Sequence, residues 1–214
     1  MKKITCIGIL LFSILLNTSN IVAQKIPYMT QIDNEELKYI DNSEISIIDW
    51  IEYEFAVKNR FGANSPEFLS VIPDTAFFKK HYNFSYISAK NSDGKHKYSE
   101  RDVEFMKKNY EKYPMIGISY QQCIDYCKWR TEVYNFKIKG VKKIEFSLPN
   151  KEDFKKAELY ADKTFNPPLS ILINKKSGKP QGITDNVIEY SLENKDLVDN
   201  RPIGFRCVAK VTKQ

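Results

Sequence analysis

The sequence predicts an α+β fold, and three observations lead to that prediction. Capping signals mark about three helices, which begin after Ser46, Ser119 and Asn150. Short segments with the composition of β-strands lie between these helices and at the C-terminal end. Strands and helices do not alternate regularly along the chain, which argues against a parallel α/β sheet.

The first 23 residues have the features of a secretory signal peptide. Two lysines precede an apolar run over residues 4–16, which is shorter than the ~20 residues a membrane-spanning helix needs. We therefore expect cleavage near Ala23, a mature chain beginning at Gln24 or Lys25, and a periplasmic, outer-envelope or secreted location. Cys6 does not follow the apolar region, where an acylated lipoprotein cysteine would lie.

The remaining residues, 24–214, have the size of a single domain. The whole chain carries 33 Lys and Arg against 27 Asp and Glu, and the basic residues are spread out instead of forming a block. This pattern indicates a solvated surface and not a nucleic-acid interface. No segment after the signal peptide is apolar for long enough to span a membrane. The chain also has 13 Tyr and 13 Phe, which favours core packing and leaves glycan contact as an alternative.

The first predicted elements lie between residues 37 and 62. The segment "LKYIDNSEIS" is typical of a strand followed by a turn, and Ser46 with Asp49 predicts the start of a helix. An apolar stripe then continues until Gly62 ends the helix; its members are Ile47, Trp50, Ile51 and Phe55.

Residues 62–112 carry many turn and charge signals, which predict a loop-rich insertion with short ordered pieces. Loops often carry binding residues, so a ligand site is expected here if anywhere. The two histidines of the chain, His81 and His96, lie in this region, away from the cysteines in sequence.

The stretch "YPMIGISYQQCIDYCKW" predicts the central helix, beginning at Tyr120 after a capping box of Ser119 and Gln122. Cys123 and Cys127 then lie four residues apart, on the same face, which we expect to be the core face.

After removal of Cys6, three cysteines remain, which in an oxidising compartment implies one disulfide and one leftover thiol. Cys123 and Cys127 are poorly placed to bond each other within one helix. A zinc site would need further ligands from distant segments, and a redox pair would need the C-x-x-C spacing. The residues alone leave the pairing open.

The C-terminal half adds a third helix and several strands. Asn150 with Asp153 predicts a helix whose apolar members are Phe154, Ala157 and Leu159. Strands are predicted in residues 167–182, in 186–192 and, as one terminal strand, in 203–211.

Five of these segments resemble, in order and spacing, the motifs of the formylglycine-generating enzyme family, the sulfatase-modifying-factor domain. They are "YIDNSEISIIDWIEY", "YPMIGISYQQCIDYCKW", "FSLPNKEDFKKAE", "DNVIEYS" and "GFRCVAK". The family counterparts look like "EVTN..Y..F", "SW..A..YC.W", "LPTE.EWE.A", "GNVWEW" and "GFR". The resemblance covers residues 39–210 and implies the family's compact α+β variant of the C-type-lectin-like fold.

The resemblance also implies roles for the cysteines. In family members with structural disulfides, the cysteine of "YC.W" pairs with the cysteine of "GFRC", which here are Cys127 and Cys207. Cys123 stands where the family usually has alanine, so it is expected to be a buried free thiol.

The departures from the family argue against catalysis. The copper-binding cysteine pair of the family lies between "NVWEW" and "GFR", and the corresponding "LENKDLVDNRPI" has no cysteine. The family's calcium site uses the glutamate of "NVWEW", here Glu189, but its acidic or amide partner is replaced by Gly182. No catalytic residue, no cofactor and no metal site are therefore expected, and Glu189 is only a weak calcium candidate.

The expected function is that of a non-catalytic binding or scaffold module whose partner is another envelope protein. The chain resembles, more loosely, the non-catalytic family members found among lipoproteins of gliding motility and the associated secretion machinery. Two alternatives are a divergent metal-dependent oxidase of the same family and a lectin-like module that binds glycans.

Overall fold

The computed structural model describes residues 26–82, 84–89, 108–137, 142–162, 178–183, 187–199 and 201–213. Helices and short strands are mixed without a repeating βαβ pattern, so the predicted α+β class is confirmed. The expected signal peptide, His96 and the strand expected near residue 170 lie outside the described residues. Among the helices that are described, none is both long enough and apolar enough to cross a bilayer.

Four antiparallel strands form the main sheet, in the order β1-β2-β6-β3. Their bounds are Met29–Asp33 for β1, Lys38–Asp41 for β2, Val208–Lys213 for β6 and Lys142–Ser147 for β3. The strand β6 lies between β2 and β3, so the last strand of the chain pairs with one of the first. Two short strands, β4 (Ile188–Glu189) and β5 (Ile203–Gly204), pair in parallel beside this sheet.

The three main helices begin where their capping signals predict. Helix α1 spans Ile47–Phe61 and starts with a capping box. Helix α5 spans Tyr120–Lys137; the Ser119 N–H donates to Gln122 Oε1 (2.7 Å), and the Gln122 N–H donates to Ser119 Oγ (3.2 Å). Helix α6 spans Lys151–Tyr160 and has a third capping box. Each box satisfies backbone N–H groups that the first helical turn leaves without partners.

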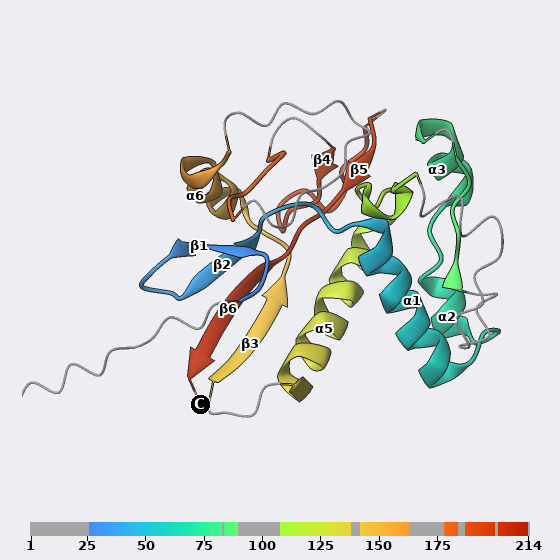
Figure 1. Ribbon diagram of the computed structural model, residues 1–214, viewed down its shortest axis with the longest axis horizontal. Helices are drawn as coiled ribbons and strands as arrows, with labels where there is room; N and C mark the ends of the chain where they lie inside the picture. Colours follow the sequence, from blue (N-terminus) through green and yellow to red (C-terminus); the bar gives the residue numbers. More distant parts are fainter. Residues whose placement is uncertain are drawn as a thin grey trace, which may run out of the picture.

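The main core lies where α1, α5 and the C-terminal segment meet, with α5 between the sheet and α1 (Figure 1). Trp50 of α1 is fully buried and stacks on Tyr126 of α5, with ring centroids 5.6 Å apart and an interplanar angle of 11°. Phe205 packs edge-on against both rings. The Trp50 indole N–H donates to the carbonyl of Val71 (3.0 Å), which satisfies the polar atom of this buried ring.

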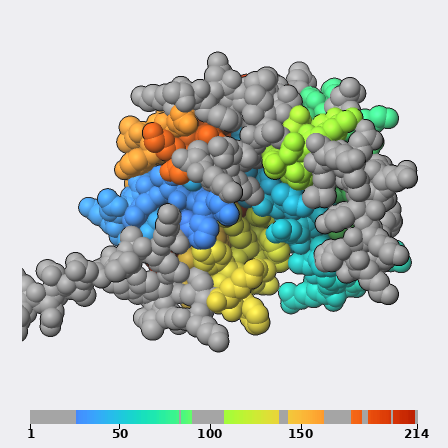
Figure 2. All heavy atoms as spheres, viewed as in Figure 1, coloured from blue at the N-terminus to red at the C-terminus, as the bar shows by residue number. Residues whose placement is uncertain are grey.

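Helix α6 covers a smaller core against β1, β2 and β6, formed by Ile32, Ile40, Ala157 and Val208. In Figure 2 the atoms of α6 lie directly against those of β1 and β2. The Lys38–Asp153 ion pair, at 2.7 Å, ties α6 to β2. Leu159 is 79% exposed, so the prediction that it is an apolar member of the helix face is wrong.

The described ends of the expected insertion are more ordered than its turn and charge signals predict. They contain α2 (Pro66–Ser70), α3 (Thr75–His81) and the short 3₁₀ helix η2 (Tyr110–Lys112). Phe68, Phe78 and Tyr82 are buried in the main core. This part of the chain therefore extends the core beyond α1 instead of forming surface loops.

The predicted terminal strand is divided in two. β5 ends at Gly204 and β6 begins at Val208, and the three residues between them, Phe205, Arg206 and Cys207, are all fully buried. A regular strand would turn every second side chain to the opposite face. Three consecutive buried side chains therefore fit an irregular crossing between the two sheets better than one continuous strand.

A buried carboxylate fastens residues 86–89 to α1. Glu54 accepts hydrogen bonds from the Tyr86 hydroxyl (2.7 Å), the Ser88 hydroxyl (2.9 Å) and the Ala89 N–H (2.8 Å). Burial raises the pKa of Glu54 from 4.5 to about 7, although these hydrogen bonds oppose the shift.

Glu54→Gln should flatten the pH dependence of stability. The folded protein holds the Glu54 proton more tightly than the unfolded chain, so the free energy of unfolding falls as pH rises from 4.5 to about 7 and then levels off. This carboxyl contributes at most about 3 kcal/mol of that fall. Urea unfolding at about pH 5 and about pH 7.5 measures the difference. The exposed Glu67→Gln variant should keep the wild-type slope, and an equal slope in all three proteins would contradict this role.

Candidate functional site

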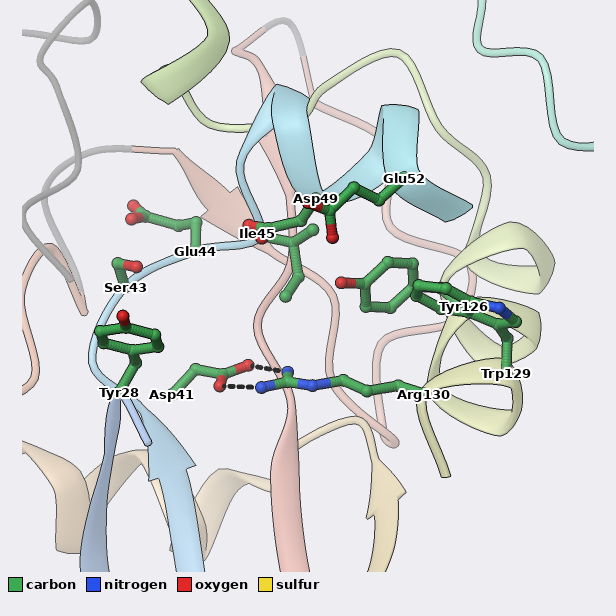
Figure 3. Close-up of a pocket in the computed structure, with 10 residues that line it drawn as sticks. All are labelled: Tyr28, Asp41, Ser43, Glu44, Ile45, Asp49, Glu52, Tyr126, Trp129 and Arg130. Carbon is green, nitrogen blue, oxygen red and sulfur yellow. Dashed lines mark hydrogen bonds and ion pairs between the residues drawn. The ribbon is translucent and has the colours of Figure 1, made fainter. Parts of the chain in front are cut away.

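A cavity of about 330 Å³ opens between the end of β2, the start of α1 and one face of α5 (Figure 3). Residues from all three elements line it, and Tyr28 stands at its edge. A volume of this size is at the lower end of the range for small-molecule and side-chain pockets.

The wall next to β2 is polar and yet buried. Asp41, Ser43 and Glu44 are 5%, 4% and 2% exposed. The backbone of this segment is held by the C-terminal segment, because the Asp41 N–H donates to the Cys207 carbonyl (2.9 Å) and the Ile45 N–H donates to the Phe205 carbonyl (2.8 Å). The segment leaves the sheet but stays in the interior, and these bonds give its backbone N–H groups partners there.

An ion pair closes the inner end of the cavity. Arg130 of α5 donates two hydrogen bonds to the carboxylate of Asp41, at 2.6 and 2.8 Å. Its guanidinium also lies over the ring of Phe146, 4.3 Å from the centroid. Burial alone would lower the pKa of Arg130, but Asp41 more than offsets this, so the guanidinium stays charged. Bidentate geometry of this kind fixes the positions of both side chains.

The hydroxyl of Tyr126 points into the cavity (Figure 3). The side chain is 4% exposed, and Trp50 and Phe205 fix its ring. No described residue makes a hydrogen bond with this hydroxyl, and the same is true of the Ser43 hydroxyl on the facing wall. Burial, and next the charge of Asp49, raise the pKa of Tyr126, which keeps the phenol protonated. Two hydroxyl groups are thus available to a ligand.

Four carboxylates line the cavity: Asp41, Glu44, Asp49 and Glu52. Asp41 is paired with Arg130, and Glu44 lies 3.9 Å from the guanidinium of Arg206. The aromatic faces of Tyr28 and Trp129 lie beside these charges. The arrangement can therefore hold a polar ligand by hydrogen bonds and ring contacts, without a covalent step.

A second buried ion pair supports the segment that forms the polar wall. Arg206 is fully buried and donates to the Glu189 carboxylate through Nε (2.7 and 3.0 Å) and Nη2 (2.6 Å). Its Nη1 donates to the Asp41 carbonyl (3.2 Å), and Nη2 also donates to the Gln181 carbonyl (2.9 Å). The Glu44 carboxylate lies 3.9 Å from the same guanidinium. Arg206 therefore joins β2, β4 and the cavity wall.

The weak calcium candidate Glu189 is occupied by this ion pair. Burial raises the pKa of Glu189 to about 7, and Arg206 opposes the shift. A calcium ion binds to six or more oxygen atoms, and a carboxylate whose two oxygens face a guanidinium is poorly placed to be one of them. Within the described part of the chain, no three His, Cys, Asp or Glu side chains are grouped as metal ligands.

The predicted cysteine pair lies together in the core. The sulfur atoms of Cys127 and Cys207 are 3.4 Å apart and both residues are free thiols in this structure, so the disulfide stays a prediction. Cys123 is fully buried one turn away on the same helix face, as expected. Burial raises the pKa of the Cys123 and Cys207 thiols well above the usual range. A raised pKa disfavours the thiolate, which is the nucleophilic form.

In the part of the chain that the structure describes, His81 does not join the cysteines or carboxylates in a metal-binding group. His81 lies at the end of α3, where burial and next the charge of Lys80 lower its pKa. His96 lies outside the described residues.

The cavity is not predicted by the sequence patterns. The segment after β2 has the composition of a turn, whereas its polar residues are buried side by side. The available signals were the uninterrupted polar run "DNSE" between a strand and a helix, and the spacing of Tyr126, Trp129 and Arg130 on one face of α5.

No protein-family model, no curated protein and no solved structure matches this chain. The resemblance to the formylglycine-generating enzyme family therefore remains an inference from the sequence motifs.

Proposed function

We propose that this chain is an exported, non-catalytic binding or scaffold module of the cell envelope, built on the formylglycine-generating enzyme type of the C-type-lectin-like fold. The observation that carries the binding function is the cavity between β2, α1 and α5, into which the hydroxyl of the largely buried Tyr126 side chain points without a hydrogen-bond partner among the described residues. A few polar groups of this kind in a pocket fix the orientation of a ligand.

The environment of the cysteines supports a non-catalytic role. Cys123, Cys127 and Cys207 lie in the main core beneath the cavity and do not line it. A nucleophilic or metal-binding thiol works as a thiolate and has to meet its substrate or its metal. Burial opposes both requirements, whereas it suits a structural disulfide and an inert thiol.

The arrangement of the strands is compatible with the proposed fold. The strand β2 leads directly into α1 and pairs with the last strand, β6, and α5 packs on the same sheet through β3. On the looser resemblance to gliding-motility and secretion lipoproteins, the partner is another envelope protein.

An oxidase assay on the exported full chain tests the non-catalytic role. A cysteine peptide of the sulfatase type, incubated with the protein, Cu(I) and oxygen, should keep its mass. Conversion to formylglycine that disappears in Cys123→Ala would contradict the proposal, because it would place the chemistry on a rebuilt cysteine site.

The intact mass of the exported protein should correspond to a start at Gln24 or Lys25, and a retained N-terminus or a lipid on Cys6 would contradict the proposed processing.

Glycan binding is the second candidate, favoured by the aromatic faces of Tyr28 and Trp129 beside carboxylates at the cavity edge. Tyr28 is 54% exposed and could stack on a sugar ring. A glycan array with and without calcium tests this function.

A further inference from the structure

We propose that the cavity between β2, α1 and α5 binds a neutral sugar ring without calcium, and that Tyr28 is the aromatic platform on which this ring stacks. The inference rests on the proposed binding function and deepens its glycan candidate, because it assigns the site, the class of sugar and the residues that hold it. It combines the unusual backbone of Tyr28, two hydroxyl groups inside the cavity and the pairing of the charges that line it.

Tyr28 has a left-handed backbone conformation that bulky residues rarely adopt. Its φ is 62°, at the third position of a four-residue turn in which the Met29 N–H donates to the Ile26 carbonyl (3.3 Å). Glycine or asparagine is usual at such a position, because a large side chain is strained there. Strained residues persist where the surrounding structure holds them, and they gather at functional sites and ligand clamps. A tyrosine at this position therefore points to a use for its ring.

The turn holds Tyr28 at the mouth of the cavity. Ile26 and Met29, on either side of the central residues, are both buried in the main core. The Tyr28 carbonyl also accepts a hydrogen bond from the Asn42 N–H (2.9 Å). The Tyr28 side chain itself is about half exposed and lines the cavity on the side opposite α5 (Figure 3). The backbone is thus fixed in place, and the ring has free surface for a ligand.

Two hydroxyl groups inside the cavity match the hydroxyl groups of a sugar. Those of Tyr126 and Ser43 lie on facing walls, and neither makes a hydrogen bond with a described residue. A hydroxyl group both donates and accepts, so each can bond a sugar hydroxyl in either sense. A sugar ring carries hydroxyl groups around its edge and can reach both walls at once. Its faces carry C–H groups, which pack on the aromatic surfaces of Tyr28 and Trp129.

The charged groups of the lining favour a neutral ligand. Each carboxylate there already has an interaction partner; the four are Asp41, Glu44, Asp49 and Glu52. Arg130 donates two hydrogen bonds to Asp41, and the Arg206 guanidinium lies 3.9 Å from Glu44. A charged ligand would compete with these contacts and lose its own hydration, whereas a neutral sugar leaves them intact. Because the carboxylates are engaged, the hydroxyl groups and rings hold the sugar directly and not through a calcium ion.

Isothermal titration calorimetry on the full chain tests the proposal with defined neutral sugars. The probes are maltotriose, mannotriose, lactose and triacetylchitotriose, each titrated with EDTA present. Tetrahydropyran is the control ligand, because it keeps the six-membered ring and lacks the hydroxyl groups. We expect at least one sugar to bind, with an affinity that does not change as salt is added, and we expect no binding of tetrahydropyran.

Tyr28→Asn separates the ring from the backbone that carries it. Asparagine tolerates a positive φ, so this variant should keep or raise the melting temperature and yet weaken the best probe about tenfold. Tyr28→Phe keeps the ring and should retain most of the affinity. Tyr160→Asn makes the asparagine change at a similarly exposed tyrosine at the end of α6, away from the cavity, and should leave the affinity unchanged.

Tyr126→Phe tests the hydroxyl group inside the cavity. The variant keeps the buried ring and removes one hydrogen-bonding group, so it should weaken the best probe about tenfold. Tyr160→Phe is the matched control and should bind as the wild-type chain does.

The outcomes separate the sugar site from the wider binding function. No response to any of the sugars, binding only after calcium is added, equal binding of tetrahydropyran, or an affinity unchanged in Tyr28→Asn would overturn the inference. A soluble envelope protein that binds the wild-type chain and not Tyr126→Phe, with no response to sugars, would keep the binding function and replace the sugar by a protein. None of these results alters the oxidase assay, which tests the non-catalytic function independently.

Discussion

Glu189→Ala should lower the free energy of unfolding by about 3 to 5 kcal/mol, as expected when one partner of a buried ion pair is removed. The variant leaves the Arg206 guanidinium fully buried and without the carboxylate that accepts from its Nε and Nη2. The contacts of Arg206 with the Asp41 and Gln181 carbonyls remain but carry no formal charge, and the Glu44 carboxylate, 3.9 Å from the guanidinium, compensates it only in part. Because Arg206 also fixes the segment after β2, the cavity wall should loosen as well.

An exposed ion pair of the same chemistry gives the matched control. Glu36 pairs with Lys210 at 3.2 Å, and both side chains are about half exposed. Glu36→Ala should therefore cost less than about 1 kcal/mol. Urea unfolding at neutral pH measures both variants. Similar losses in the two would show that the buried pair does not have the structural role assigned to it.

The second large effect is expected from the cysteines. We predict that Cys127 and Cys207 form a disulfide in an oxidising compartment, because their sulfur atoms already face each other at 3.4 Å in the core. The bond would close a loop spanning 80 positions, for which chain entropy gives about 4 to 5 kcal/mol of stabilisation. That is a large share of the ~5 to 15 kcal/mol that stabilises a typical domain. Cys207→Ser should therefore lower the melting temperature markedly.

Reductant and alkylation distinguish the disulfide from other causes of instability. Reductant should destabilise the wild-type protein and leave Cys207→Ser unchanged, and Cys123→Ala should cost little because it removes a single sulfur from the core. In the denatured, unreduced mature protein, only Cys123 should be alkylated. Alkylation of all three thiols, or a peptide linking Cys123 with Cys207, would contradict the pairing.

The helices could be predicted from the sequence because their starts are encoded locally. In each of the three capping boxes, the side chain of a serine or asparagine accepts a hydrogen bond from the backbone N–H of the residue three positions later, and that residue's side chain accepts one in return. No distant contact is needed to recognise this pattern. The buried face of α5 also followed from helical spacing, which places Cys123 and Cys127 together.

The C-terminal strand shows where local patterns fail. Residues 203–211 alternate as a single strand would, but the core buries Phe205, Arg206 and Cys207 in succession. Arg206 enters the core because Glu189, the Asp41 carbonyl and the Gln181 carbonyl meet there. These partners lie 17, 165 and 25 positions from Arg206 in the sequence, and a periodicity argument contains no information about them.

The cavity was missed for a similar reason. Its charged wall lies at the end of β2 and its aromatic wall belongs to α5. The two walls are far apart in the sequence, since Asp41 and Arg130 are separated by 89 positions. The polar run after β2 is typical of an exposed turn, and only the hydrogen bonds with the C-terminal segment explain why it is buried.

The two tryptophans allow the most direct test of the central claim, that this chain is a binding module whose ligand site is the cavity between β2, α1 and α5. Trp129 lines the cavity, whereas the indole N–H of Trp50 is bonded to Val71 in the core. A ¹H–¹⁵N spectrum of the full chain should therefore show two indole signals, which Trp129→Phe assigns. Titration with soluble proteins and glycans of the cell envelope should move the Trp129 signal saturably and the Trp50 signal much less. An unchanged Trp129 signal, or an equal shift of both signals, would contradict the claim.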